Sequence, residues 1–385
     1  MALSSRWLII ISALLVVLGS LGQSTLGILL LLISLLYPPF TKYFVGQIKE
    51  LNPQKNKLVM FSQGLVVLAV LSTLIVATND LNAWGTALGL AIIVLVVFNA
   101  GLVARHTAGD LVWSFWVLGS VLATAFVFYD RYIRINHRAG LLVGCNAAGT
   151  LLLISLSVFL AMVFKETPQR RWIYAILALL SLFGVLLTVS RAAWVGMLAL
   201  FLSLPFFGIK TKKLMIVVLC ACLLLGILIY NIPFWRYRFS TIFSATGESS
   251  RINGYKTATK MMLRNPVGIG LSRFQAHYSA YISEEKELLS HAHNIYLQFG
   301  SELGPLGMLL SLLIYLSIPY MCYQIAKTKP YYGPIGAGFL AVAVRELFDC
   351  TTLGLSVAGF IWFFFGYICA EYIKTVSLER KTTIA

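Results

Sequence analysis

Arginine and histidine are the side chains of this sequence whose type and position could support chemistry. Arg191 lies in the segment 188–194, between two long apolar stretches. A charged side chain at such a place is costly and is usually retained for a function. We therefore interpret Arg191 as a guanidinium that binds an anion at the outer mouth of a helix bundle. The alternative is an interfacial turn anchored by Trp194.

A polar segment from about 232 to 292 carries a second group of cations. Its basic residues are Arg236, Arg238, Arg251, Lys256, Lys260, Arg264, Arg273 and Lys286, against only four glutamates. The planar fork of arginine binds two phosphate oxygens together. The segment therefore favours a pocket for a diphosphate, and attraction to anionic lipid headgroups is the simpler alternative.

Two histidines, His291 and His293, stand where this polar segment returns to an apolar stretch, and Asn294 follows them. On a helix, residues i and i+2 face different directions, and no carboxylate or thiol stands nearby at metal-ligand spacing. We therefore expect no metal site. A single histidine as general base is the better interpretation, because histidine titrates near working pH. The alternative is an interfacial histidine packed against the arginine-rich segment.

Acidic residues are few and scattered. No Asp-x-Asp pair is present to hold a divalent ion on a diphosphate. We therefore expect no cofactor, and side-chain cations must neutralise any phosphate. Arg345 and Asp349 are spaced i, i+4 beside Glu346 and can pair on one helix face. A self-neutralising pair within a bundle and a contact to substrate both fit this spacing.

The elements that must position these residues are membrane-spanning helices. Of 385 residues, 59% are hydrophobic and only 11% are charged, whereas about a quarter of a soluble domain is charged. The apolar residues form continuous runs, which do not fit the alternating pattern of a transmembrane β-barrel. The sequence predicts an all-α polytopic membrane protein. All six cysteines lie in or at the ends of apolar runs, which argues against structural disulfides and zinc.

A helix needs about 20 apolar residues to cross a bilayer. About twelve spans are predicted, near 7–20, 24–40, 58–77, 84–104, 111–129, 140–164, 172–188, 192–208, 214–231, 301–323, 333–348 and 353–373. The first two could form one tilted helix, but the turn at 22–24 favours two. We expect a bundle of about nine spans at 1–231, a long loop at 232–292 and three C-terminal spans at 293–385.

The formal net charge of +16 is best explained by membrane topology. With both termini in the cytoplasm, 17 of the 30 basic residues fall on cytoplasmic segments and eight fall in the long loop. Basic residues collect in cytoplasmic segments of membrane proteins. We therefore place the long loop outside the cytoplasm and expect no nucleic-acid partner. The first apolar run lacks a small-residue cleavage site, so we expect no cleavable signal peptide.

The long loop itself is expected to contain short helices. Ser249 and Ser250 predict the start of a helix that covers 251–263. Asn265-Pro266 and the glycines of 268–270 then break it. A second short helix is expected around 272–283.

Three stretches together resemble the O-antigen ligase superfamily, which also holds O-antigen polymerases and protein O-oligosaccharyltransferases. The first, SRAAW at 190–194, is similar to the family's Ser-Arg-Gly-x-Trp turn. The second runs from 251 to 274 and includes NPVGIG. The third is His293-Asn294, nine residues and then GPLG at 304–307, and it is the most specific. The region of resemblance covers about 175–310.

This resemblance implies a GT-C-like enzyme of a bacterial inner membrane, with both termini cytoplasmic. It implies transfer of a glycan from undecaprenyl diphosphate to a sugar hydroxyl of lipid A–core at the periplasmic face, among membrane lipids and without a metal. His293 would be the catalytic base, and Arg191 and Arg251 would bind the donor diphosphate. Further substrate contacts are expected from His291, Asn294, Lys260, Arg264 and Arg273.

Two rival functions remain open at this point. An O-antigen polymerase would share the donor and the arginines but use a second lipid-linked glycan as acceptor; the spacing between His293 and Gly304 favours the ligase. A polytopic lipid or glycan transporter would belong to another class. Transporters often show paired halves with broken helices, and no such repeat is visible in this sequence.

Overall fold

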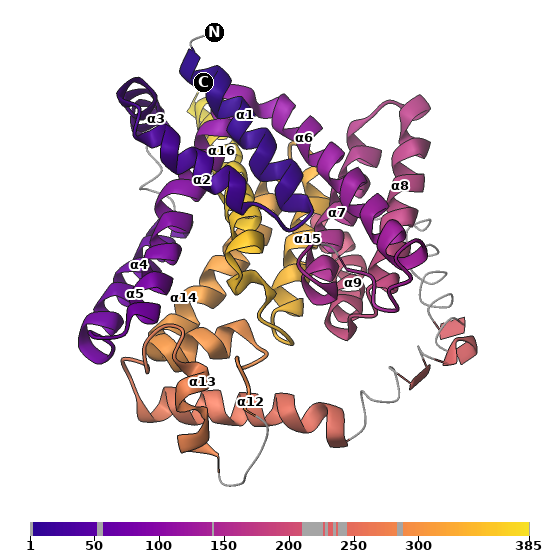
Figure 1. The fold of residues 1–385 in the computed structure, drawn as a ribbon. Coiled ribbons are helices and arrows are strands. Elements are labelled where there is room, and N and C mark those ends of the chain that lie inside the picture. The colour runs from indigo at the N-terminus through magenta and orange to yellow at the C-terminus, as the bar shows by residue number, and fades with distance from the viewer. Residues whose placement is uncertain are drawn as a thin grey trace.

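The computed structural model describes residues 3–51, 57–140, 142–209, 226–227, 230–233, 236–237, 245–282 and 288–384. Regular structure in these residues is helical, without a β-strand. Figure 1 shows a helix bundle with one further helical layer across one end. The prediction of an all-α polytopic membrane protein is therefore confirmed.

The N-terminal region forms two short helices rather than one tilted span. Helix α1 (Leu3–Ser20) ends at a turn in which Gly22 has a φ of 81°, and α2 (Thr25–Leu35) follows. The chain then bends by 104° into α3 (Pro38–Leu51). The predicted span 24–40 is thus wrong at its C-terminal end, because Pro38 begins a new helix in a different direction.

The next two predicted spans are joined end to end after α4 (Lys57–Val76). Helix α5 (Leu81–Ile92), the π-helical turn η2 (Ile93–Val97) and α6 (Phe98–Tyr132) form one 52-residue apolar stretch. Ala108 has non-helical backbone angles and bends α6. This bend lies between the predicted spans 84–104 and 111–129, which are therefore two arms of one kinked helix.

Three helices form one side of the bundle. Helix α7 (Cys145–Lys165) packs on α8 (Pro168–Leu187), and α9 (Arg191–Ser203) continues into the 3-10 turn η3 (Leu204–Phe207). The predicted break of the apolar stretch 172–208 at Ser190 is confirmed. Val189 provides the break with a left-handed φ of 53°.

The C-terminal helices complete the bundle. They are α14 (Ile295–Ala326), α15 (Tyr332–Arg345) and α16 (Leu355–Ile384), with the 3-10 turn η5 (Thr351–Leu353) before α16. Six helices in the described residues are long and apolar enough to cross a membrane, or seven if the bent pair α2–α3 is one span. The predicted span 214–231 lies mostly outside the described residues.

A separate helical layer lies across the end of the bundle opposite both termini (Figure 1). It contains α12 (Ala245–Arg264), α13 (Phe274–His277) and the 3-10 turn η4 (Tyr278–Tyr281). Helix α12 begins before the predicted cap at Ser249-Ser250, so those serines lie inside the helix. The second short helix is confirmed. This layer has its own apolar core, formed by Ala258, Met261, Ile269, Phe274, Tyr278, Leu289 and Ala292.

The layer is fixed to the bundle by backbone contacts with a kink in α14. Ile269 N donates to Ser301 O at 3.0 Å, and Gly270 N donates to Glu302 O at 3.0 Å. Gly304 forms the kink with a φ of 76°, and a Cβ there would collide with the carbonyl of Pro266. The glycine-containing stretches 265–270 and 304–307 are therefore two sides of one interface.

Candidate functional site

The two histidines lie side by side in a turn at the entrance to α14. His293 has a left-handed φ of 55°, so residues 291–293 are not helical. The two imidazole rings are 4.3 Å apart between centroids. The premise that these histidines face different directions is therefore wrong, because it assumed helical geometry.

Both histidines face one carboxylate from the turn after α15. His291 Nε2 is 3.6 Å and His293 Nδ1 is 3.8 Å from Asp349 Oδ1. Burial raises the pKa of Asp349, but the neighbouring imidazoles of His291 and His293 and the charge of Arg345 outweigh it and hold the pKa well below its usual range. Asp349 is therefore an anion that can orient an imidazole and stabilise it once it takes up a proton.

Asp349 is held in turn by Arg345, whose side chain is fully buried. Arg345 Nη2 lies 3.4 Å from Asp349 Oδ2 and donates to the carbonyl of Asn146 at 2.9 Å. Arg345 Nη1 contacts Glu346 Oε1 at 2.7 Å. The predicted i, i+4 pair is present, and it forms part of a larger buried network beside the histidines.

Glu346 connects this network to η5 and to α14. Its carboxylate accepts hydrogen bonds from Thr351 Oγ1 at 2.6 Å and from Thr352 Oγ1 at 2.9 Å. Its backbone carbonyl accepts from Ile295 N at 2.9 Å. The turn that carries Asp349 is therefore fixed relative to the first residue of α14, immediately after the histidines.

A second polar chain fixes the histidine turn from the side of α14. Ala292 N donates to Gln298 Oε1 at 2.7 Å, and Gln298 Nε2 donates to Glu302 Oε1 at 2.8 Å. Gln298 and Glu302 are both buried, and neither was predicted as a site residue. Their i, i+4 spacing places them on one helix face. This spacing is the only feature of the sequence that indicates a hydrogen bond between the two side chains.

Asn294 caps α14. Its Oδ1 accepts hydrogen bonds from Tyr296 N and Leu297 N, both at 3.0 Å. These bonds satisfy backbone donors that the first turn of a helix leaves without partners. The side chain predicted as a further substrate contact is thus part of the framework that sets the direction of α14.

Arg251 lies on the face of α12 that approaches the histidine turn. One turn further along this helix, Tyr255 Oη donates to Leu347 O at 2.9 Å, and a Cβ on Gly254 would stand 3.0 Å from Ala292 O. Arg251 is half-buried and forms no ion pair or side-chain hydrogen bond with the described residues. Its spacing from these contacts directs it to the side of α12 that faces the network.

Arg191 is half-buried at the first position of α9. Helix α9 packs on α15, and a Cβ on Gly196 would stand 3.3 Å from Arg345 Cβ. Trp194 is only 7% exposed, so it packs inside the bundle rather than at an exposed interface. The helix that begins at Arg191 therefore borders the buried network.

The remaining predicted contacts lie further along the layer. Arg273 Nε is 3.2 Å from Asp80 Oδ2, and its Nη1 donates to Val76 O at 2.7 Å, which ties the layer to the turn between α4 and α5. Lys260 and Arg264 are exposed and both lie against Tyr281. The structure thus brings together His291, His293 and Asn294 at one turn, and places these three cations elsewhere.

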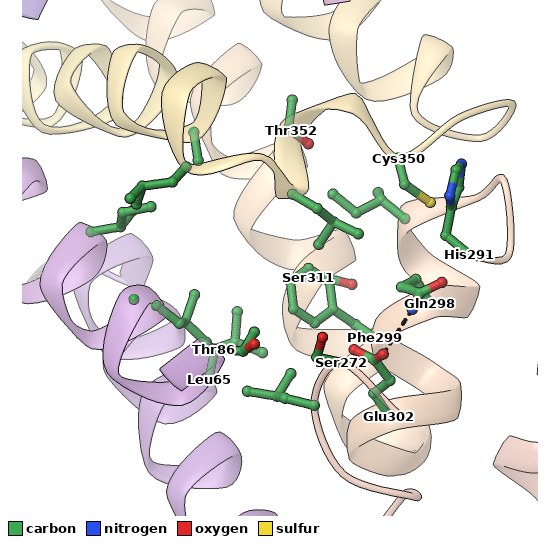
Figure 2. A pocket seen from close by; sticks show the side chains of 18 of the residues that line it. Leu65, Thr86, Ser272, His291, Gln298, Phe299, Glu302, Ser311, Cys350 and Thr352 are labelled. Atoms are coloured by element: carbon green, nitrogen blue, oxygen red, sulfur yellow. Dashed lines mark hydrogen bonds between the residues drawn. The ribbon is translucent and has the colours of Figure 1, made fainter. Parts of the chain in front are cut away.

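A cavity of about 730 Å³ opens beside the histidine turn (Figure 2). His291, Gln298, Glu302 and Ser272 line its polar part, and His293 does not line it. Apolar side chains of α4, α5, η2, α14 and α16 also line the cavity: Leu65, Leu81, Leu90, Ile93, Phe299, Ile314, Ala358 and Trp362. Polar side chains that include Thr86, Ser311 and Thr352 lie among them. A ligand with an apolar chain and a polar head at the histidines matches this distribution.

Two chemical uses of the histidine group are compatible with its geometry. His291, His293 and Asp349 offer ligand atoms that all lie within 4.8 Å of one another. Two imidazoles and a carboxylate are a donor set that a transition metal such as zinc accepts. The same three groups also form a base oriented by a carboxylate, which requires no ion.

The comparisons with known proteins concern the segment of the chain that carries most of these residues. Residues 175–312 match a family model described as O-Antigen ligase. No curated protein matches the chain. The matched segment includes Arg191, Arg251 and both histidines, whereas Arg345 and Asp349 come from the part of the chain beyond it.

Proposed function

We propose that this chain is an O-antigen ligase, because residues 175–312 match a family model described as O-Antigen ligase. The family indicates a glycosyl-transfer enzyme of the ligase or polymerase kind that acts on lipid-linked glycans. We infer that this protein moves a glycan from undecaprenyl diphosphate to a sugar hydroxyl of lipid A–core. The reaction takes place at the periplasmic face of a bacterial inner membrane.

The observation that carries this proposal is the carboxylate shared by His291 and His293. In the proposed reaction, His293 takes the proton of the acceptor hydroxyl as its oxygen attacks the anomeric carbon of the donor. The bond from that carbon to the diphosphate breaks, and the lipid diphosphate leaves with the electron pair. Asp349, which lies 3.8 Å from His293, stabilises the imidazolium that forms. The single displacement inverts the anomeric centre.

The leaving group needs positive charge rather than a proton. A lipid diphosphate departs readily once its developing charge is stabilised by positioned donors. We assign this role to Arg191 and Arg251, which begin α9 and lie on α12. Because Arg191 belongs to the bundle and Arg251 to the separate helical layer, a headgroup bound by both would lie between the bundle and that layer.

The cavity supplies the remaining requirement of a lipid-linked donor. Its apolar lining from α4, α5 and α14 suits an isoprenoid chain, and its polar end is at His291, Gln298 and Glu302 (Figure 2). A bound donor would thus extend from the histidines into the apolar part of the bundle. Burial of an isoprenoid chain supplies affinity in proportion to the apolar area removed from water.

Polymerase activity is the second candidate, because it shares the donor and the arginines. The ligase is favoured by the spacing of His293-Asn294 and the two glycines at 304 and 307. In the structure Gly304 forms the kink of α14 and contacts the outer segment at Pro266. A transporter is disfavoured by the two half-buried histidines beside the carboxylate of Asp349, because a carrier needs no base beside its arginines.

The lipopolysaccharide profile of a gene-deleted host tests the proposal. It is compared with extracted lipid-linked glycans, after complementation with wild type, His293→Ala or the matched control His106→Ala, whose side chain is exposed on α6. A ligase predicts core-only lipopolysaccharide and accumulated lipid-linked polymer for the deletion and for His293→Ala, with rescue by the control. A core capped by one repeat unit would instead establish the polymerase, and normal profiles would overturn both.

A further inference from the structure

A short basic segment at the end of the bundle that carries the site comprises the last two residues of α6 and the loop after it, and is called the loop 131–138. It contains Arg131, Arg134, His137 and Arg138, while Asp130 is the only acidic residue in 130–138. Arg134 and His137 are exposed, and Arg131 and Arg138 are half-exposed. Few basic residues are expected on this side of a membrane protein, so three arginines in eight positions need a reason.

The loop has a defined internal structure. Buried Asp130 accepts hydrogen bonds from Gly140 N at 2.8 Å and from Asn136 Nδ2 at 3.1 Å. Its other carboxylate oxygen lies 3.4 Å from Arg134 Nη1. Ile135 has a left-handed φ of 56°, which reverses the chain. The loop is therefore held from inside by one carboxylate, which also pairs with Arg134.

Two of these arginines have no acidic partner among the described residues. Arg131 Nη1 donates to Asn136 O at 3.3 Å and contacts His137 Nδ1 at 3.4 Å. The Nε of Arg138 is buried without a hydrogen-bond partner in the described residues. A buried donor without a partner is costly, and movement of the Arg138 side chain toward a bound anion would give this nitrogen an acceptor.

The loop is tied to both sides of the candidate site. Ala139 N donates to Leu187 O at 3.1 Å, four residues before Arg191. Further along the chain, at the start of α7, the carbonyl of Asn146 accepts a hydrogen bond from Arg345 Nη2 at 2.9 Å. The cations thus stand on a segment that links the start of α9 to the network holding Asp349. This segment lies outside residues 175–312, which match the family model.

We propose that the loop 131–138 binds phosphoryl groups on the acceptor glycolipid and so orients its hydroxyl toward His293. This inference rests on the proposed function and names what the acceptor must carry, namely phosphate on its glycan. Arginine binds phosphate through paired hydrogen bonds. The internal hydrogen bonds of the loop fix the cations together, as a bound polyanion requires, rather than leaving each to follow the membrane surface separately.

The test compares Arg131→Gln/Arg134→Gln/Arg138→Gln with the matched triple variant Arg170→Gln/Arg171→Gln/Lys327→Gln. The control residues are exposed and lie at the start of α8 and at the end of α14. Each protein is reconstituted in nanodiscs of zwitterionic or of anionic lipid. The Kd and KM are measured for a phosphorylated lipid A–core acceptor and for the same acceptor after phosphatase treatment.

The loop variant is expected to weaken binding of the phosphorylated acceptor by about tenfold or more, in Kd and in KM. The dephosphorylated acceptor should bind both proteins equally weakly, and the KM for donor should not change. Equal losses for both acceptors would overturn the inference. A loss seen only in anionic nanodiscs, whatever the acceptor, would assign the loop to membrane lipid instead and overturn it as well.

Two further readouts keep the outcome interpretable. Arg131→Gln alone removes a guanidinium that contacts only Asn136 and His137 in the described residues, so it tests the inference if the triple variant fails to fold. The binding measurement does not depend on turnover. Phosphate-dependent binding without any glycan transfer would refute the ligase and leave this inference standing.

Discussion

At the scale of single residues, the carboxylate of Asp349 determines what the two histidines can do. One anion serves both rings, and Arg345 fixes that anion from the buried side. A general base functions best when a third group holds its orientation. The sequence predicted the base but not its partner, because the separation of Asp349 from His293 along the chain concealed their contact.

Asp349→Asn should lower kcat by roughly 10²- to 10⁴-fold, since general-base catalysis contributes about that much, while the KM for donor stays near wild type.

The low pKa of Asp349 also has a consequence for stability. A depressed folded-state pKa stabilises the protein above the unfolded-state pKa of about 4. The stability difference between wild type and variant should therefore be constant near neutral pH and shrink only in strong acid. The control for the kcat measurement is Asp110→Asn, at an exposed position of α6. Equal kcat values for the Asp349→Asn and Asp110→Asn variants would contradict the role of Asp349 in orienting the base.

Arg251→Lys should reduce transfer strongly, because lysine keeps the charge but loses the planar fork that binds two phosphate oxygens. The measurement is glycan transfer by purified protein at saturating acceptor, with varied donor. Arg264→Lys is a matched control on the same helix, exposed and stacked on Tyr281. Near-normal transfer by Arg251→Lys would refute bidentate binding at this position.

Chelation separates the two chemical uses of the histidine group. The proposed mechanism predicts that EDTA leaves transfer by purified enzyme unchanged. The donor set of His291, His293 and Asp349 makes the experiment informative, because these atoms lie within 4.8 Å of one another. Loss of transfer on chelation, with recovery on adding Zn²⁺ or Mg²⁺, would show that the group holds an ion.

At the scale of helices and turns, the glycines of the two motif stretches act at one interface. Gly304 has a φ of 76°, and its Cα faces the carbonyl of Pro266. Gly268 has a φ of 84° and faces the carbonyl of Glu302. The interface therefore sets the position of α12, and with it Arg251, relative to the histidine turn at the start of α14.

Gly304→Ala should destabilise this interface by about 2 kcal/mol or more, because it adds both backbone strain and a steric clash. The expected result is lower thermal stability, and weaker donor binding that accompanies displacement of α12. Gly46→Ala is the control, since its Cβ would meet nothing within 4 Å. Unchanged stability in Gly304→Ala would show that the layer does not depend on this contact.

The limits of the sequence-based prediction are visible in these elements. Runs of apolar residues predict helices because membrane crossing demands length and hydrophobicity, and the break at Ser190 is marked by polar residues. The bend at Pro38 and the continuity of α5 with α6 depend on how the helices pack. The length and hydrophobicity of an apolar run do not predict this packing. The prediction for the histidine turn was wrong because a left-handed φ at His293 cannot be predicted from the residue type. The role of Gln298 and Glu302 could not be predicted because it depends on hydrogen bonds that only the folded structure shows.

At the scale of the whole molecule, both termini lie at one end of the bundle and the layer of α12 and α13 lies at the other (Figure 1). With the bias of basic residues, this arrangement predicts that the layer faces the periplasm. A membrane-impermeant maleimide applied to intact spheroplasts should label Ser279→Cys and not Lys374→Cys, both exposed positions. Permeabilised cells serve as the control, and the reverse labelling pattern would invert the proposed orientation.

The position of Asp349 between α15 and α16 has a consequence for biogenesis. During translation, the histidine turn is synthesised before Asp349, whose carboxylate both imidazoles share. A nascent chain that has inserted only as far as α14 would hold the arginines but lack the complete base. Competence for the proposed transfer would therefore arise only at the end of insertion.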